Sequence, residues 1–207
     1  MPDAATLALF SIATLALNLS PGPDVFSFGH GPKGGLLATI GVSAGIVVHT
    51  LLAAFGVASL LAAYPWTYEA VRLVGAAYLI WLGVSVLRAS GEVSKPPAVL
   101  STRQILRRGF LTNLLNPKVA LFFVAFLPQF VDPARGAVAA QMMVLGALFI
   151  CSGTLVNTGY ALLGGWVHEG FRRDPRWYQR LQLVSGGILV VLGARLLLPV
   201  FSGRSSG

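Results

Sequence analysis

The stretch Asn18-Leu-Ser-Pro-Gly-Pro-Asp24 interrupts the first long apolar segment of the chain. Pro21 and Pro23 remove two backbone donors, and Gly22 between them has a permissive backbone, so the sequence predicts a broken helix. A second break, Asn113-Leu-Leu-Asn-Pro-Lys118, has the same Asn-Leu start and again a proline, now followed by the opposite charge. An open backbone and an ionisable side chain are stable at membrane depth only where protein or a water-filled cavity surrounds them. Both breaks therefore predict an interior site.

The composition is that of an integral membrane protein. Of 207 residues, 55% are hydrophobic and 11% are charged, whereas soluble domains have about 25% charged residues. The net charge of +8 comes from cations in short segments between apolar runs, which favours a role in membrane orientation over nucleic-acid binding. The single cysteine, Cys151, excludes a disulfide within the chain and a redox pair of thiols.

Six apolar runs are long enough to cross about 30 Å of hydrocarbon. The first run carries Asp3 and lacks the basic residues of a signal peptide, so we expect it to be retained. The predicted fold is all-α, a polytopic membrane protein in which the first and fourth helices are broken at proline. The six predicted spans are Thr6 to Phe28, Leu36 to Ala62, Tyr68 to Leu87, Gly109 to Val131, Ala137 to Gly165 and Leu181 to Val200.

Basic residues concentrate in the first, third and fifth loops between these spans. The positive-inside rule therefore predicts that these loops are cytoplasmic and that both termini lie outside. The third loop, about residues 89–108, contains the only linker-like stretch, with Gly91, Pro96 and Pro97. It divides a single transmembrane domain into repeats of about 4–88 and 109–200, followed by a flexible tail over 201–207.

The two predicted repeats resemble each other in sequence. Residues 72–83 align with residues 182–193, with identical leucine or glycine at 73/183, 79/189, 82/192 and 83/193. The first helices of the repeats match around their proline breaks. Because each repeat has three helices, the second copy must enter the membrane from the opposite face. The sequence thus predicts two inverted three-helix repeats, an architecture typical of secondary transporters.

The residues at the breaks suit a zwitterionic ligand. Pro23 and Pro117 fit the first position of a half-helix, and Asn116 is a good N-cap. The N-terminal end of a half-helix attracts a carboxylate. Our hypothesis is that Asp24 binds an α-ammonium group and that Lys118, with the Asn116–Pro117 end, binds the carboxylate. The alternative is an Asp24–Lys118 ion pair that only holds the first helix to the fourth. The predicted substrate-binding residues are Asp24, Lys118, Asn116, Pro117, Pro21, Gly22, Pro23 and Asn113.

Two further groups of polar residues are candidates for proton coupling or for lining the cavity. Gly41, Gly45 and His49 share one face of the second helix, so the histidine should face a neighbouring helix. It is either a proton carrier or a side chain hydrogen-bonded to a backbone carbonyl at a break. In the fifth helix, a polar patch lines the same cavity or serves interhelical hydrogen bonding: Ser152, Gly153, Thr154, Asn157 and Tyr160. We find no cluster of metal ligands, no cofactor motif and no nucleophile with its base, so an enzyme is not predicted.

With these motifs in order, the chain resembles the lysine exporter (LysE/RhtB) family of bacterial amino-acid efflux proteins. The likeness extends from about Ala4 to Pro199. It includes the Ser20-Pro-Gly-Pro-Asp24 stretch, the helix face formed by Gly41, Gly45 and His49, and the Asn116-Pro-Lys118 break. It implies a six-helix secondary exporter in the inner membrane, driven by a gradient of protons or other ions. One departure is the first loop, Gly29-His-Gly-Pro-Lys-Gly-Gly35, in which Lys33 is the only basic residue.

The sequence leaves a second class of function open, namely a non-transporting intramembrane enzyme or assembly partner. Within the exporters, other small solutes and cations are alternatives to amino acids, although the lack of a cysteine or carboxylate cluster disfavours soft cations. The expected partners are an amino-acid substrate, a coupling ion and membrane lipids. Small-residue faces permit a homodimer without requiring one.

Overall fold

The computed structural model describes residues 2–19, 31–64, 66–88, 100–173 and 175–202, and this part of the chain contains helices and no strand. The proline break of the first helix, residues 20–24, lies outside the described residues, as do residues 89–99 of the third loop. Eight α-helices are present in the described part: α1 (Ala4–Leu19), α2 (Gly31–Leu51), α3 (Ala58–Ala63), α4 (Thr67–Arg88), α5 (Thr102–Leu114), α6 (Pro117–Leu121), α7 (Val138–Arg173) and α8 (Pro175–Ser202).

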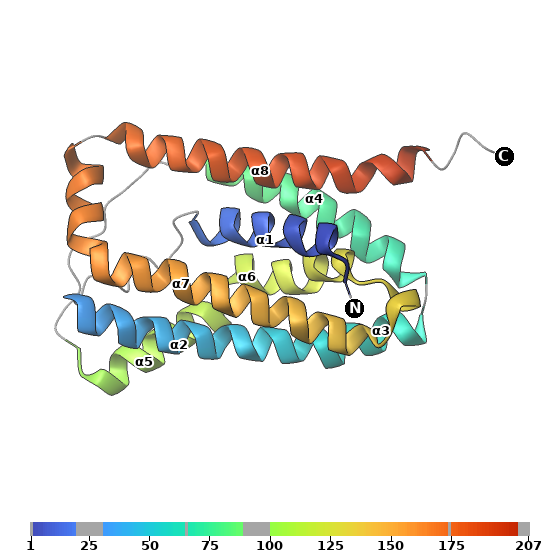
Figure 1. The fold of residues 1–207 in the computed structure, drawn as a ribbon, viewed down its shortest axis with the longest axis horizontal. Coiled ribbons are helices and arrows are strands. Elements are labelled where there is room, and N and C mark those ends of the chain that lie inside the picture. Colours follow the sequence, from blue (N-terminus) through green and yellow to red (C-terminus); the bar gives the residue numbers. More distant parts are fainter. Residues whose placement is uncertain (1, 20–30, 65, 89–99, 174, 203–207) are drawn as a thin grey trace.

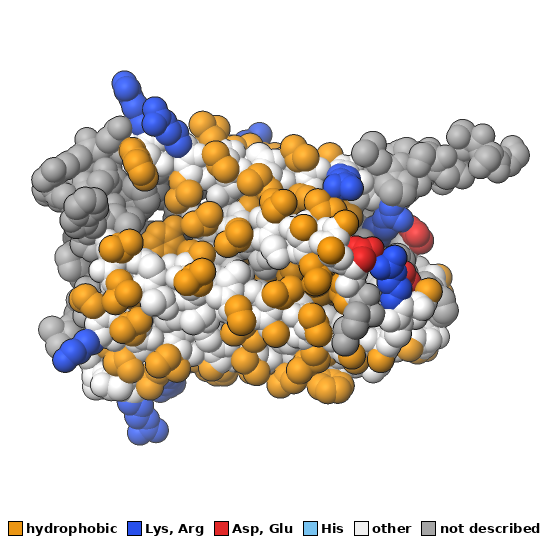
Figure 2. Space-filling model, in the orientation of Figure 1, with side chains coloured by type: hydrophobic (Ala, Val, Ile, Leu, Met, Phe, Trp, Pro, Cys, Tyr) orange, Lys and Arg blue, Asp and Glu red, His pale blue; other side chains and the backbone are white. Residues whose placement is uncertain are grey.

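Among the described residues, four helices are long and apolar enough to cross a membrane. They are Gly31–Ala63, Glu69–Arg88, Val138–Leu163 and Gln179–Leu197. The pair Thr102–Leu114 and Pro117–Phe130 makes a fifth span, bent by 47°, and α1 is a sixth apolar helix of 16 residues. Hydrophobic side chains spread over the middle of the molecule and cations gather toward its ends (Figure 2). The predicted all-α polytopic membrane fold is confirmed.

The second span is one continuous helix with a local widening. A π-helical segment, Leu52–Val57, joins α2 to α3, and the helix ends at Ala63 before the turn that leads into α4. The start was predicted too late, because α2 begins at Gly31 and so includes most of the expected first loop.

The fourth span breaks where the sequence predicted. Helix α5 ends at Leu114, and α6 begins at Pro117 and continues as the π-helical segment Phe122–Phe126. The predicted start at Gly109 was wrong, since α5 begins at Thr102, and the division into repeats and linker stays a prediction. The start of α5 is fixed by a capping box, in which the Ser101 hydroxyl accepts from the Gln104 amide and the Gln104 side chain accepts from the Ser101 amide.

Helices α4 and α8 pack against each other through glycines at corresponding positions. A methyl group on Gly83 would lie 2.7 Å from the Gly186 carbonyl oxygen and 2.9 Å from the Val190 amide nitrogen. A methyl group on Gly193 would lie 2.9 Å from the Ala76 carbonyl oxygen and 3.1 Å from the Ile80 amide nitrogen. The second set of positions is the first set related by the offset that aligns residue 72 with residue 182. Such reciprocal contacts are what a two-fold axis between the helices produces, and they support the inverted repeat for this pair.

Helix α1 occupies the middle of the bundle. Figure 1 shows it between α4 and α8 on one side and α2 and α7 on the other. Its buried side chains include Phe10, Ala13 and Leu17. The last turn of α1 contacts the fourth and fifth spans through the Leu17 and Leu19 carbonyls.

Candidate functional site

The break of the fourth span is built by Asn116 and Pro117. The Asn116 side chain is buried, and its Oδ1 accepts the amide of Lys118 at 3.0 Å. Pro117 stands at the first position of α6, where a missing amide proton costs nothing. Asn113, in the last turn of α5, is buried, and its side-chain oxygen has no hydrogen-bond partner among the described residues. The predicted N-cap is thus confirmed.

Lys118 reaches from this break to the end of α1. Its ammonium Nζ donates to the carbonyl oxygen of Leu17 at 3.2 Å, and its own carbonyl accepts the hydroxyl of Tyr78 at 3.2 Å. A lysine at the centre of a membrane span costs about 2.5–3.5 kcal/mol of insertion free energy. The hydrogen bond from the ammonium to the Leu17 carbonyl offsets part of that cost. The structure brings Lys118 to the end of the helix that precedes the first break.

The other half of the predicted charge pair is not described. Asp24 lies outside the described residues, together with Pro21, Gly22 and Pro23. The pairing of Asp24 with Lys118, whether with a ligand between them or directly, therefore stays a prediction.

Helix α7 contacts the same end of α1 from another side. The Tyr160 hydroxyl donates to the Leu19 carbonyl at 3.2 Å, and the Asn18 amide donates to the Ser152 hydroxyl at 3.1 Å. Asn157 is half-buried and lies between these two contact points along α7. The polar patch expected in the fifth helix thus faces α1 at Ser152 and Tyr160, and the role of Asn157 stays a prediction.

His49 lies against the break of the fourth span. Its Nε2 is 3.4 Å from the Asn113 carbonyl oxygen, and its ring stacks on Phe123 with centroids 5.8 Å apart. Because a carbonyl oxygen only accepts, this contact assigns the proton to Nε2. A methyl group on Gly45, one turn earlier, would lie 2.7 Å from the Asn113 side-chain oxygen. The predicted contact of this helix face with a carbonyl at a break is confirmed, and proton transport by His49 remains a hypothesis.

A group of phenylalanine rings fills the space beyond the break, and we call it the ring cluster. It runs from Phe123 beside His49 to Phe130, with successive ring centroids 6.1, 4.7 and 4.7 Å apart. Its six rings come from α1, the fourth span and α7: Phe10, Phe122, Phe123, Phe126, Phe130 and Phe149. All but Phe130 are buried. The cluster separates the break from the end of the bundle at which the chain begins.

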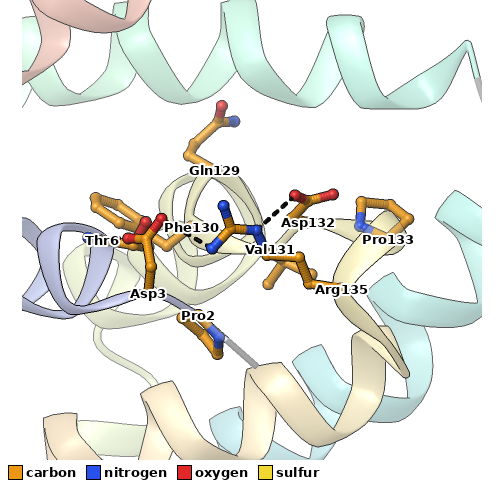
Figure 3. A pocket seen from close by; sticks show the side chains of 9 residues that line it. All are labelled: Pro2, Asp3, Thr6, Gln129, Phe130, Val131, Asp132, Pro133 and Arg135. Carbon is orange, nitrogen blue, oxygen red and sulfur yellow. Dashed lines mark hydrogen bonds and ion pairs between the residues drawn. The ribbon is translucent and has the colours of Figure 1, made fainter.

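At that end is a pocket of about 420 Å³. In Figure 3 the Arg135 guanidinium lies between two carboxylates, donating to Asp3 at 2.9 Å and to Asp132 at 3.1 Å. Asp3 also accepts the Thr6 amide at 2.8 Å and so caps α1. This bond, followed by Arg135, holds the pKa of Asp3 below its usual value of 3.8.

Two contacts of this arrangement were missed from the sequence. Tyr78 lies on an apolar helix in which nothing marks its partner, the Lys118 carbonyl. The Asp3–Arg135 pair joins residues that are remote in the chain, and no motif marks either residue as part of a site. A capping signal was available for Asp3, because it precedes a helical run directly. No local signal was available for Arg135.

Comparison with known proteins identifies close relatives over most of the chain. The model of the LysE type translocator family matches residues 15–199. A homoserine/homoserine lactone efflux protein of Salmonella typhimurium is 30% identical over 194 residues, which span 90% of this chain and 93% of that protein. A leucine efflux protein of Klebsiella pneumoniae is 37% identical over 135 residues, 59% of this chain and 62% of that protein. No solved structure matches the chain.

Proposed function

Because the chain belongs to the LysE type translocator family, we propose that it is a secondary exporter of amino acids across the bacterial inner membrane. The relatives are named for the efflux of homoserine, its lactone and leucine. We extend this to small amino acids with neutral side chains. Export is driven by a gradient of protons or another ion, and both termini lie outside the cell.

The observation that carries the proposal is the position of Lys118. Its ammonium extends from the break of the fourth span and contacts the Leu17 carbonyl at the end of α1. A cation held at a helix break inside a membrane span is suited to bind a carboxylate. Asp24 supplies the opposite charge in the predicted site.

Two features support alternating access, namely closed contacts on one side of the break and the reciprocal packing of α4 and α8. The ring cluster and the Arg135 ion pairs close the outer side of the break. The reciprocal packing of α4 and α8 supports two related halves, which give an exporter two states of similar energy. In this proposal, the outward-open state requires the ring cluster and the Asp3–Arg135 pair to separate.

The decisive experiment is counterflow of radiolabelled leucine, homoserine and other amino acids into liposomes that contain the purified protein. We expect counterflow for at least one neutral amino acid, and its loss in Asp24→Asn and in Lys118→Met. Lys33→Met is the matched control, because Lys33 is an exposed lysine at the start of α2. No counterflow across the panel would favour a non-transporting enzyme or assembly partner, and normal rates in both variants would refute the site.

The direction of insertion needs a separate test. An alkaline phosphatase fused after Gly207 is active only outside the cytoplasm. We expect activity from this fusion in intact cells, together with low activity from a fusion in the third loop. The reverse pattern would refute the predicted orientation.

A further inference from the structure

Prolines at the two breaks leave three carbonyl groups without their helical donors. In an α-helix each carbonyl accepts the amide four residues later, and proline has no amide proton in any conformation. The proline and carbonyl pairs are Pro21 with Leu17, Pro23 with Leu19, and Pro117 with Asn113.

Each of these three carbonyl oxygens is contacted by a side chain from another helix. Those contacts are Lys118 Nζ with Leu17 at 3.2 Å, the Tyr160 hydroxyl with Leu19 at 3.2 Å, and His49 Nε2 with Asn113 at 3.4 Å. The Asn113 carbonyl also accepts the amide of Asn116 at 3.0 Å, so the break of the fourth span satisfies it locally. The two carbonyls of α1 depend on side chains among the donors that the structure describes.

The donor at Leu17 is chemically the same group as the one that an amino acid carries. Lys118 offers a primary ammonium with three N–H donors, as does the α-ammonium of an amino acid. The C-terminal end of a helix bears partial negative charge, which favours a cation at the last carbonyls. In other transporters with broken helices, such ends coordinate cations.

We propose that the Leu17 carbonyl is the subsite for the substrate's ammonium group, and that Lys118 occupies this subsite when no substrate is bound. The inference rests on the proposed export of amino acids and deepens it. An incoming amino acid places its ammonium on Leu17, and the released Lys118 meets its carboxylate beside Asn116.

This arrangement selects zwitterions. A primary amine without a carboxylate has to displace Lys118 and offers that lysine nothing in return. A carboxylate without an ammonium draws Lys118 away and leaves the Leu17 carbonyl without a donor. Only a ligand with both groups exchanges one set of contacts for another.

The test measures binding of three probes of similar shape to purified protein by thermal shift and calorimetry. They are leucine, isoamylamine, which is leucine without its carboxylate, and isocaproate, which lacks the ammonium. We expect wild type to bind leucine at least about tenfold more tightly than either analogue. Lys118→Met should lose about tenfold or more in leucine affinity and gain about tenfold in isoamylamine affinity, because the Leu17 carbonyl is then vacant.

Two further variants keep the test decisive if the methionine variant does not fold. Lys118→Gln retains a donor without charge and should bind isoamylamine between wild type and Lys118→Met. Lys118→Arg keeps a cation and should bind it no better than wild type. Lys33→Met is the control and should match wild type with all three probes.

Isoamylamine affinity that is unchanged or reduced in both Lys118→Met and Lys118→Gln would overturn the inference. It would mean that Lys118 only locks the fourth span to α1. The proposed function is tested separately by counterflow of amino acids. If counterflow fails but the Lys118 variants gain affinity for isoamylamine, the exporter is refuted and the subsite stands. If counterflow occurs but the variants gain no affinity for isoamylamine, the exporter stands and the subsite is refuted.

Discussion

The reciprocal glycine contacts between α4 and α8 give a quantitative prediction for Gly83→Ala and Gly193→Ala. In both positions the added methyl group would meet the backbone of the opposite helix, at 2.7 Å for the Gly186 carbonyl and 2.9 Å for the Ala76 carbonyl. Backbone atoms in a helix cannot rotate away, so the two helices must separate.

The expected magnitude is the difference of two effects. Overpacking of a well-packed contact costs about 1–3 kcal/mol, and replacing a helical glycine by alanine gains about 0.5–1 kcal/mol. The net loss is about 0–2.5 kcal/mol in the free energy of unfolding. For a chain of this size that corresponds to a melting temperature lower by up to about 10 °C. Gly83→Ala should cost slightly more than Gly193→Ala, since its contacts are closer.

The assay is thermal denaturation of the purified variants in one detergent, followed by tryptophan fluorescence. Gly187→Ala is the matched control on α8, because no atom lies within 4 Å of a methyl group there. It should raise the melting temperature by about 1–4 °C. If Gly83→Ala and Gly193→Ala behave like Gly187→Ala, the close packing of these helices is refuted. If one is destabilised and the other is not, the two-fold relation fails.

Three more predictions concern individual residues: Asp3, Gln141 and Cys151. The pKa of Asp3 is lowered in the folded state, so its contribution to stability is present above pH 3.8 and is lost as the pH falls through the lower folded pKa. Hydrogen-exchange protection factors for residues 4–10 should therefore fall on acidification. In Asp3→Ala these protection factors should be low at every pH. The buried Gln141 bonds the Asp132 amide and carbonyl and the Gly136 carbonyl, so Gln141→Leu should lower stability by about 2–3 kcal/mol in thermal denaturation, whereas the exposed Met143→Leu should not. Cys151 is exposed on α7, and we expect this surface to face lipid. Because maleimides react with the thiolate, which hydrocarbon disfavours, labelling of Cys151 should be slow in liposomes and complete after denaturation. Equally fast labelling in both conditions would contradict that orientation.

The parts of the fold that could be predicted are those set by covalent chemistry and composition. Proline lacks an amide proton wherever it stands, so the break at Asn116–Pro117 was visible in the sequence. Apolar length identified the five spans that the structure describes in full, and the glycine spacing at Gly41 and Gly45 placed His49 against another helix. These inferences needed no knowledge of distant contacts.

The boundary of α5 was missed although its signal is local. Ser101 and Gln104 form a capping box, a pattern that marks a helix start. The basic residues that follow are typical of a cytoplasmic loop, so charge and capping indicate different starts for this helix. An amphipathic helix that buries only Ile105, Gly109 and Asn113 is consistent with both observations.

Other contacts could not be predicted, because they depend on how distant segments meet. The pairing of Asp3 with Arg135 requires the first residues and the end of the fourth span to lie together. The bond from Tyr78 to the Lys118 carbonyl requires α4 to pass the break. The partners of Leu17 and Leu19 are an intermediate case. The prolines identify these carbonyls as groups in need of donors, but only the structure shows that Lys118 and Tyr160 supply them.

These contacts also explain how binding at the break can be coupled to opening of the outer side. Among the described residues, α1 contacts the fourth span and the segment after it at three levels: Asp3 with Arg135, Phe10 in the ring cluster, and Leu17 with Lys118. A substrate that takes over the Leu17 carbonyl replaces the third contact with a mobile ligand and leaves the other two intact. The first of these is an exposed ion pair, which contributes little in water, and the second consists of ring contacts that a shift of α1 would break together. We therefore expect α1 to be the element that moves, and the α4–α8 contact, which carries no part of the site, to remain packed while it does.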